Sequence, residues 1–375
     1  MVGVASQAAP AFRRTDAVRP GFCSSTKHRS RLSSSGGSPA TALLAALFLC
    51  AVERVEAQEP FRFPTANHAL FERGHEEKFF VGTTGKSWES GCFGCVRSEG
   101  SQMHEGLDIR CLERDRHGEP SDAVLAAADG TVVYCNLRPS RSNYGNYVVI
   151  RHRVDGLEIY SLYAHLSKIA DGIAPGRAVE AGENIGVMGR TSNTRETISK
   201  DRAHVHFELN LFVNDRFPAW FKQTSPNERD DHGEWNGQNL LGVDPRLVLL
   251  GEHDAHDRFN MLDFLRSQTE LCRVLVRKAN FPWVKRYAAL VRPNPVAARD
   301  GIAGYEIALN FNGVAFELIP RAASELDPGR KGRYSLLSVN ESEYQSHPCR
   351  RLVERTGGRW QLAPAGISLL DLLTF

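Results

Sequence analysis

Short runs rich in β-branched and aromatic residues, separated by turn dipeptides, dominate the chain between residues 104 and 212. The runs are TVVYC (131–135), YVVIRH (147–152) and LEIYSLYAHL (157–166), and the turn dipeptides include Asp129-Gly130 and Asp155-Gly156. Short runs of this composition bounded by turn signals are typical of strands joined by hairpins. The pattern therefore predicts an all-β unit made of antiparallel strands.

A second alternating segment, YEIALNFNGVAFELIP at 305–320, lies nearer the C-terminus. Its apolar positions alternate on both sides of Asn312-Gly313, which predicts a hairpin with a two-residue turn and one buried face. Residues 213–242 contain prolines and a run of charges, which indicates a loop insertion, and residues 255–266 have enough apolar positions for a brief helix. The C-terminal part is expected to be β-rich, and it shows no catalytic pattern.

The length of 375 residues favours two ordinary hydrophobic cores over one large core. We predict an N-terminal arm of irregular structure at 58–100, a first domain at 101–250 and a second β-rich domain at 251–375. The oligomeric state cannot be predicted from the sequence.

The N-terminus resembles an export signal. Several arginines precede the apolar run ATALLAALFLCAV at 40–52, and Val55-Glu56-Ala57 follows it. The run is shorter than the roughly 20 residues that a membrane-spanning helix needs. We therefore predict a signal peptide at 1–57 and a secreted or periplasmic protein, not associated with the membrane after cleavage. An uncleaved anchor and a lipid on Cys50 are weaker alternatives.

The charge balance argues against a nucleic-acid partner. Removing residues 1–57 takes seven Lys or Arg and three Asp or Glu from totals of 46 and 44, which leaves 39 basic and 41 acidic side chains. A nearly neutral chain has no general basic field of the kind that attracts phosphate backbones.

The cysteines favour disulfides, because an even number follows the predicted signal peptide and export leads to an oxidising compartment. We expect Cys111 to pair with Cys135 and Cys272 with Cys349, although spacing alone does not prove connectivity. Cys92 and Cys95 form a CxxC pair for which a disulfide role is favoured over a zinc knuckle or a redox motif. These are the six that follow residue 57: Cys92, Cys95, Cys111, Cys135, Cys272 and Cys349.

Two imidazoles lie on one face of the predicted strand HVHFEL. Because strand side chains alternate, His204, His206 and Glu208 point to one side and the apolar residues between them to the other. Taken alone, this could be a pair of surface histidines. Upstream, MHEGLDIR places His104 and Asp108 close together across Gly106, where the chain can turn sharply.

The string from His104 to Asp108 also resembles a zinc-binding HExxH helix that lacks its last histidine, in which Glu105 would be a general base. We reject this interpretation, because Gly106 and strand-like flanks argue against a helix there. Between the two motifs, LYAHLS places His165 near a strand end, where it is a candidate third imidazole.

In this order, HxxxD, YxHL and HxH resemble the lysostaphin-type (LytM-like) zinc metalloendopeptidases of peptidoglycan. Ala128-Asp129-Gly130-Thr131, Tyr144-Gly145-Asn146-Tyr147 and VEAGENIGVMGRT at 179–191 also match that family's pattern. The resemblance covers about 104–212. It implies an antiparallel β-sheet core with a substrate groove.

The resemblance further implies one Zn²⁺ per chain, held by His104, Asp108 and His206. Three protein ligands leave a position for water, as catalytic zinc requires. His165 and His204 would then be the catalytic residues that move protons and stabilise charge. The sequence does not assign these two roles individually.

We therefore expect a zinc metalloendopeptidase that hydrolyses peptide bonds of peptidoglycan cross-links or stems through a metal-bound water, with peptidoglycan as its partner. Alternatives are a non-catalytic module that binds cell wall or activates an amidase, and a secreted peptidase of a protein substrate. The other histidines match no motif and are interpreted as surface or linker residues: His68, His75, His117, His152, His232, His253, His256 and His347.

Overall fold

Antiparallel sheets make up the part of the chain that contains the predicted metal ligands. The structure is a computed structural model, and it describes residues 61–375 apart from 195–196, 256–257 and 330–331. The predicted signal peptide at 1–57 lies outside these residues. Within them, no helix is both long enough and apolar enough to cross a bilayer.

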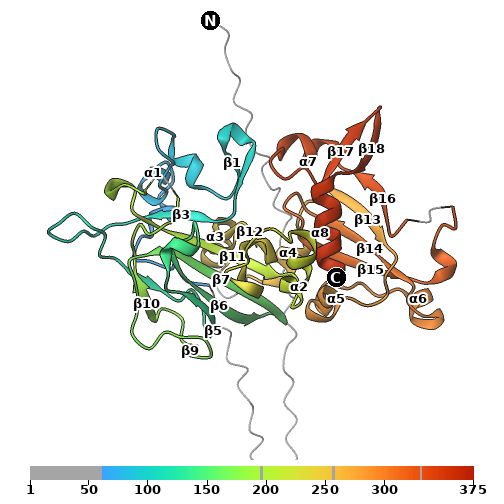
Figure 1. Cartoon of the computed structure of the whole chain (residues 1–375), viewed down its shortest axis with the longest axis horizontal. Coiled ribbons are helices and arrows are strands. Elements are labelled where there is room, and N and C mark those ends of the chain that lie inside the picture. The colour runs from blue at the N-terminus through green and yellow to red at the C-terminus, as the bar shows by residue number, and fades with distance from the viewer. Residues whose placement is uncertain (1–60, 195–196, 256–257, 330–331) are drawn as a thin grey trace, which may run out of the picture. The chain divides into compact units, whose positions relative to one another are not determined.

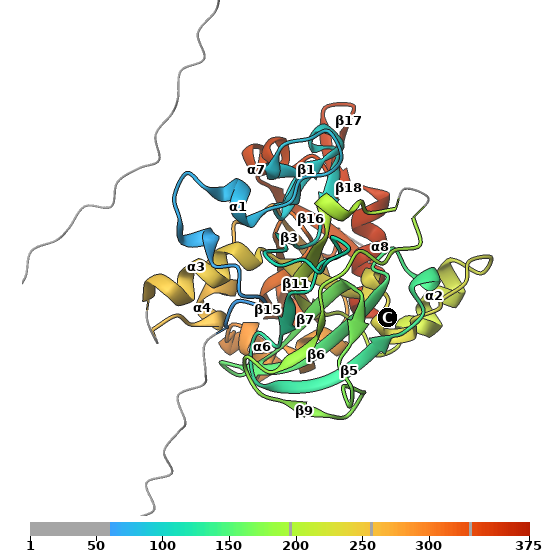
Figure 2. The same ribbon diagram turned by 90° about the vertical axis from the view of Figure 1, so that its left-hand side faces the viewer.

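The largest described sheet has the strand order β12-β11-β7-β6-β5-β9, and β3 also pairs with β11. Figures 1 and 2 show β11, β7, β6 and β5 side by side. The strand bounds are β3 Leu107–Arg110, β5 Gly130–Asn136, β6 Asn146–Val154, β7 Leu157–Leu166, β9 Ala178–Val179, β11 His204–Phe212 and β12 Leu240–Val243. All pairs are antiparallel, so the predicted all-β fold class is confirmed.

The alternation along β11 fixes which side chains face the core. Val205, Phe207, Leu209 and Leu211 are buried in the main hydrophobic cluster. The intervening positions, from His204 to Asn210, therefore project from the opposite face, as predicted. Two smaller sheets flank this unit: β4 (Ala123–Leu125), β10 (Asn184–Val187) and β8 (Lys168–Ile169), and the pair β1 (Gly94–Arg97) and β2 (Gln102–His104).

The segment predicted as an irregular arm is packed against the sheet. It contains α1 (Glu76–Phe79) and β1, and Phe79 and Phe80 have no exposed surface. Val81 N donates a hydrogen bond to Asp108 O, which attaches the segment to β3. The sequence shows little periodicity here because single aromatic residues, not a continuous face, make the contacts.

Residues 213–242, predicted as a loop insertion, contribute to the sheet. They contain α2 (Phe217–Thr224) and lead into β12, which pairs with the C-terminal half of β11. The loop prediction is therefore wrong, because Pro218 lies in the first turn of α2, where a helix tolerates proline.

The C-terminal part has its own antiparallel sheet, in the order β15-β14-β13-β16. Helices surround it, including more than the brief helix that the sequence predicted. The bounds are α3 Pro245–Ala255, α4 Met261–Arg266, β13 Cys272–Val276, α5 Pro282–Arg286, α6 Pro295–Asp300, β14 Gly304–Leu309, β15 Ala315–Arg321, β16 Tyr334–Val339, α7 Glu341–Ser346, β17 Val353–Thr356, β18 Arg359–Leu362 and α8 Pro364–Thr374. The predicted domain boundary at 250 falls within α3 and stays a prediction.

The predicted hairpin is formed by β14 and β15, but its two-residue turn is wrong. The connection runs from Asn310 to Val314, and the Asn310 side chain accepts hydrogen bonds from Asn312 N and Val314 N. Asn312 is buried and its side-chain amide donates to Gly242 O at the end of β12, at 2.7 Å. This contact with a distant strand favours the longer loop.

The predicted disulfide pairs are also wrong. Cys349 is bonded to Cys95 of β1, 254 residues away, instead of to Cys272. Cys111 and Cys135 are free thiols, as is Cys92 of the CxxC pair. The bond joins the β1–β2 hairpin to the C-terminal part of the chain, a proximity that spacing does not reveal.

Candidate metal centre

Pairing between β3 and β11 brings Asp108 and His206 together. The two residues are direct partners in this antiparallel pair, so their side chains leave the same face of the sheet. His104 ends β2, and the chain returns through Glu105 and Gly106 into β3. A Cβ at residue 106 would lie 2.3 Å from Phe207 O, so glycine lets this turn lie against β11.

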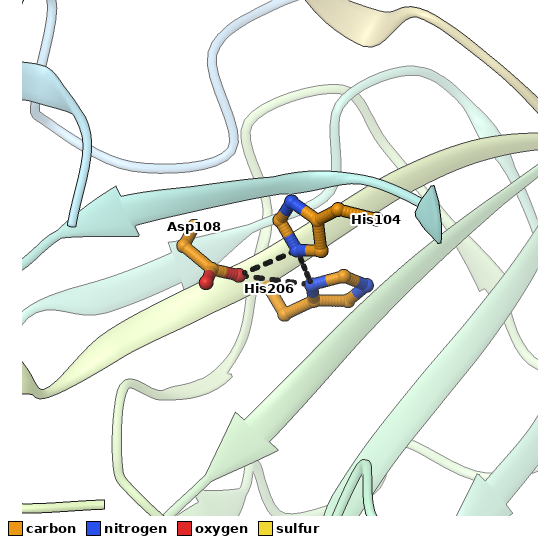
Figure 3. Close-up of side chains that lie close together, drawn as sticks. All are labelled: His104, Asp108 and His206. Atoms are coloured by element: carbon orange, nitrogen blue, oxygen red, sulfur yellow. Dashed lines mark hydrogen bonds and ion pairs between the residues drawn. The ribbon is translucent and has the colours of Figure 1, made fainter. Parts of the chain in front are cut away.

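Three ligand-type atoms converge at this point, as Figure 3 shows. His104 Nε2 lies 3.1 Å from Asp108 Oδ1 and 3.1 Å from His206 Nδ1. His206 Nδ1 lies 3.0 Å from Asp108 Oδ1. All three residues are buried. The set predicted from sequence is thus brought together on one side of the sheet.

The outer atoms of these side chains are also held in place. His104 Nδ1 lies 2.7 Å from Cys92 O, and His206 Nε2 lies 2.8 Å from Glu208 Oε1. In each contact the outer nitrogen donates its N–H to an oxygen, which turns the other ring nitrogen inward. Arg97 donates to Asp108 Oδ2 at 2.6 Å. Such outer contacts are typical of metal sites, where they fix tautomer and orientation.

The electrostatics of the cluster favour positive charge. Burial alone would raise the pKa of Asp108, but His204 and His104 hold it well below its ordinary value. Burial opposes protonation of His206, yet hydrogen bonds to Asp108 and Glu208 raise its pKa to about 10. The negative charges of Asp108 and Glu208 therefore lie close to one buried point, and the positive charge of Arg97 compensates only part of them.

This donor set fits a zinc ion. A tetrahedral ion with bonds of about 2.0–2.1 Å holds neighbouring ligand atoms about 3.3 Å apart, close to the distances of 3.0–3.1 Å found here. Two imidazole nitrogens and one carboxylate oxygen are ligand types that zinc uses in catalytic sites.

His165 and His204 lie next to this cluster. The ring centroids of His165 are 4.9 Å from His204 and 6.0 Å from His206. His165 Nδ1 lies 2.8 Å from Thr191 O, and His204 Nδ1 lies 2.6 Å from Arg202 O. Both histidines therefore present Nε2 to the interior of the site. Burial lowers the pKa of each imidazole.

His165 has a strained backbone, with φ of +64° near the end of β7. A residue with a Cβ in this region costs of order 1–3 kcal/mol and tends to occur at functional sites. Hydrogen bonds from His165 N to Tyr144 O at 2.8 Å and from His165 Nδ1 to Thr191 O hold the conformation. The fold therefore keeps a less stable backbone conformation at His165, which directs its imidazole toward the cluster.

A groove of about 530 Å³ opens above the cluster. Its lining includes the side chains of His165 and His204, together with Arg97, Tyr144 and Arg202. The Tyr144 ring lies 5.5 Å from that of His206. Burial and the nearby Glu208 raise the pKa of Tyr144 well above its ordinary value, so it stays a neutral phenol. The groove thus has both polar and aromatic walls.

Other sequence interpretations can be compared with these positions. Glu105 lies between two strands and not in a helix, which supports the rejection of HExxH. His152 is fully buried, lying against Asp129 O and Ser161 Oγ, so the interpretation as a surface or linker residue is wrong for it. No local sequence motif indicates that His152 forms hydrogen bonds with Asp129 and Ser161.

Two residues at the cluster had no role assigned from sequence. The alternation of side chains along the strand puts Glu208 on the same face as His206, and this is the sequence signal for the hydrogen bond between them. Arg97 comes from the N-terminal segment, and nothing in its local sequence indicates a partner 11 residues later in β3.

An antiparallel sheet with a buried cluster of two histidines and an aspartate, flanked by two further imidazoles, is an arrangement suited to a metal-dependent hydrolase. The model of peptidase family M23 matches residues 102–216, which confirms the resemblance seen in the motifs over this segment. The match covers the candidate ligands and both flanking histidines. No curated protein sequence matches the chain.

Solved structures resemble part of the chain. A zinc-containing peptidase from Vibrio cholerae has 22% identity and a TM-score of 0.22, over 41% of this chain and 34% of that one. A putative M23 peptidase from Pseudomonas aeruginosa has 24% identity and a TM-score of 0.21, over 28% and 37%. The lysostaphin catalytic domain from Staphylococcus simulans has 21% identity and a TM-score of 0.27, over 43% and 87%. The chain thus spans about a third of the first two structures.

Proposed function

We propose that the chain is a zinc metalloendopeptidase that hydrolyses peptide bonds in peptidoglycan cross-links or stems. The observation on which this rests is the convergence of His104 Nε2, Asp108 Oδ1 and His206 Nδ1 to within 3.0–3.1 Å of one another beside two further imidazoles. The lysostaphin-type motif set supports peptidoglycan as the substrate.

His104, Asp108 and His206 would hold one Zn²⁺. A bound zinc ion supplies a Lewis acid that polarises the scissile carbonyl and makes water more acidic. The hydrogen bonds to Cys92 O and Glu208 fix the orientation of the two imidazoles. Arg97 donates a hydrogen bond to Asp108 Oδ2, which leaves Asp108 Oδ1 directed toward the cluster.

His165 and His204 would move the protons. Because each donates its Nδ1–H to a main-chain carbonyl, each presents an Nε2 lone pair that accepts a proton. One imidazole takes the proton of the attacking water, and the other stabilises the developing negative charge or protonates the leaving amine. The strained backbone of His165 limits the directions in which its ring can point.

The test is to measure the zinc content of the purified chain together with the release of soluble peptides from purified sacculi, with and without a chelator. An unstructured protein serves as a second substrate. His206→Ala is the matched inactive variant, since it removes one ligand from the cluster.

About one zinc per chain and chelator-sensitive release from sacculi alone are the expected results. Zinc without release would contradict the enzymatic proposal and favour a wall-binding or amidase-activating module. Equal digestion of the unstructured protein would instead favour a peptidase of protein substrates.

A further inference from the structure

A second pocket, of about 750 Å³, adjoins the catalytic groove. Glu105, Asn143 and Tyr144 line both cavities, so the second is a continuation of the first. Its far wall comes from the C-terminal part of the chain, outside the M23 match, and includes Arg350 and residues of α8. A substrate that extends from the candidate metal centre past Tyr144 would meet this wall.

Arg350 is fixed in position from two directions. Its Nε donates to Asn312 Oδ1 at 2.7 Å, and buried Asn312 is anchored to Gly242 O of β12. The preceding residue, Cys349, is bonded to Cys95 in β1, whose partner strand β2 ends with the candidate ligand His104. The disulfide and the asparagine therefore place a C-terminal guanidinium beside the catalytic groove.

The charge of Arg350 is not neutralised by an ion pair with any residue that the structure describes. By contrast, Arg229 in the same pocket pairs with Asp231 at 2.6 Å and is largely exposed. Arg350 is half-buried, and Asn312 occupies only its Nε edge. A guanidinium with free donors and little hydration is suited to a carboxylate, which it can bind through two parallel hydrogen bonds.

We propose that Arg350 is a specificity-determining residue that binds a free carboxylate of the peptide substrate; this inference rests on the proposed peptidase function. Glu105 lies near enough to Arg350 to interact with it electrostatically. The negative charge of Glu105 therefore repels a doubly charged anion bound at Arg350 more strongly than a singly charged one. A carboxylate fits this balance better than a phosphate ester does.

The experiment compares two substrates that differ only in charge. Cross-linked peptides are isolated from sacculi, and one half is converted to amides with carbodiimide and ammonia. The ratio of kcat/KM for the free and amidated forms is measured for the wild-type chain and for Arg350→Gln, Arg350→Lys and Arg229→Gln. Zinc content and the Cys95–Cys349 bond are checked in each variant.

We expect the wild-type chain to prefer the free carboxylate by about 10- to 100-fold, the range of a charge-assisted hydrogen-bonded pair. Arg350→Gln should bring this ratio close to one, and Arg350→Lys should retain part of it. Arg229→Gln, the matched loss of a paired arginine in the same pocket, should keep the wild-type ratio.

A wild-type ratio near one would overturn the inference and leave the proposed function intact. The same conclusion follows if Arg350→Gln keeps the preference. Should that variant not fold, an unchanged ratio in Arg350→Lys decides against the inference. If the zinc-bound wild-type chain cleaves neither substrate, the proposed function fails first, and the inference fails with it.

Discussion

Replacing Glu208 by glutamine should weaken zinc binding although Glu208 is not a ligand. Its two carboxylate oxygens accept from His206 Nε2 and from Asn210 Nδ2, both at 2.8 Å. A glutamine side chain offers one acceptor oxygen and one NH₂ donor. Whichever way the amide turns, one of the two buried N–H groups then faces another donor.

The expected loss follows from that count. A buried donor left without an acceptor costs about 1–3 kcal/mol, and loss of an outer hydrogen bond at a metal site typically costs about 10- to 100-fold in affinity. We therefore expect the Kd for Zn²⁺ to rise by about 10- to 100-fold. Removing the negative charge acts in the same direction.

The assay is a competition titration of the metal-free chain against a chromophoric chelator. Glu105→Gln is the matched control, because Glu105 precedes Asp108 by three residues but its carboxylate forms no hydrogen bond with a ligand in the described structure. A Glu208→Gln affinity within about twofold of the wild-type value would refute the reasoning, as would an equal loss in Glu105→Gln.

Three further predictions concern other parts of the molecule. His165→Ala and His204→Ala should each retain about one zinc while turnover of sacculi falls by at least about 100-fold, as expected for loss of a proton-transfer group. Cys349→Ser should lower the free energy of unfolding by about 2–4 kcal/mol in urea titrations, because the bond to Cys95 closes a loop of 254 residues. Asp244→Asn should stabilise the chain above pH 6: burial raises the pKa of Asp244 from 3.8 to about 6, so stability falls as pH rises through this range, by up to about 3 kcal/mol.

The outcomes that contradict these predictions are distinct. Normal turnover in either histidine variant would remove that residue from the proposed chemistry, and loss of zinc would make it a structural residue of the cluster. Coincident urea curves for Cys349→Ser and the wild-type chain would exclude a stabilising disulfide. For Asp244→Asn, urea titrations at pH 4 and pH 7.5 should show a gain only at the higher pH; the same gain at both would exclude a titration effect.

Local alternation was enough to predict the strand β11 and the side of it that bears chemistry. The alternation in HVHFEL is a property of six neighbouring residues, and burial of Val205 and Phe207 fixes its sense. The position of His104 and Asp108 across Gly106 was predictable in the same way, since their convergence depends on one short turn.

Contacts between distant segments were not predictable from the sequence. The partner of Cys349 depends on where the β1–β2 hairpin meets the C-terminal part, and the loop at Asn310–Val314 depends on its contact with Gly242. Arg97 likewise reaches Asp108 only because the N-terminal segment folds back along β3. These contacts depend on three-dimensional packing, which periodicity does not describe.

The bond between Cys95 and Cys349 also sets an order of events during biosynthesis. Cys349 is synthesised 254 residues after Cys95, and oxidising conditions favour the bond between them. The hairpin that ends at His104 can therefore be locked only after Cys349 has been synthesised. A chain that stops before residue 349 has neither this bond nor Arg350, so it lacks the guanidinium that lines the second pocket.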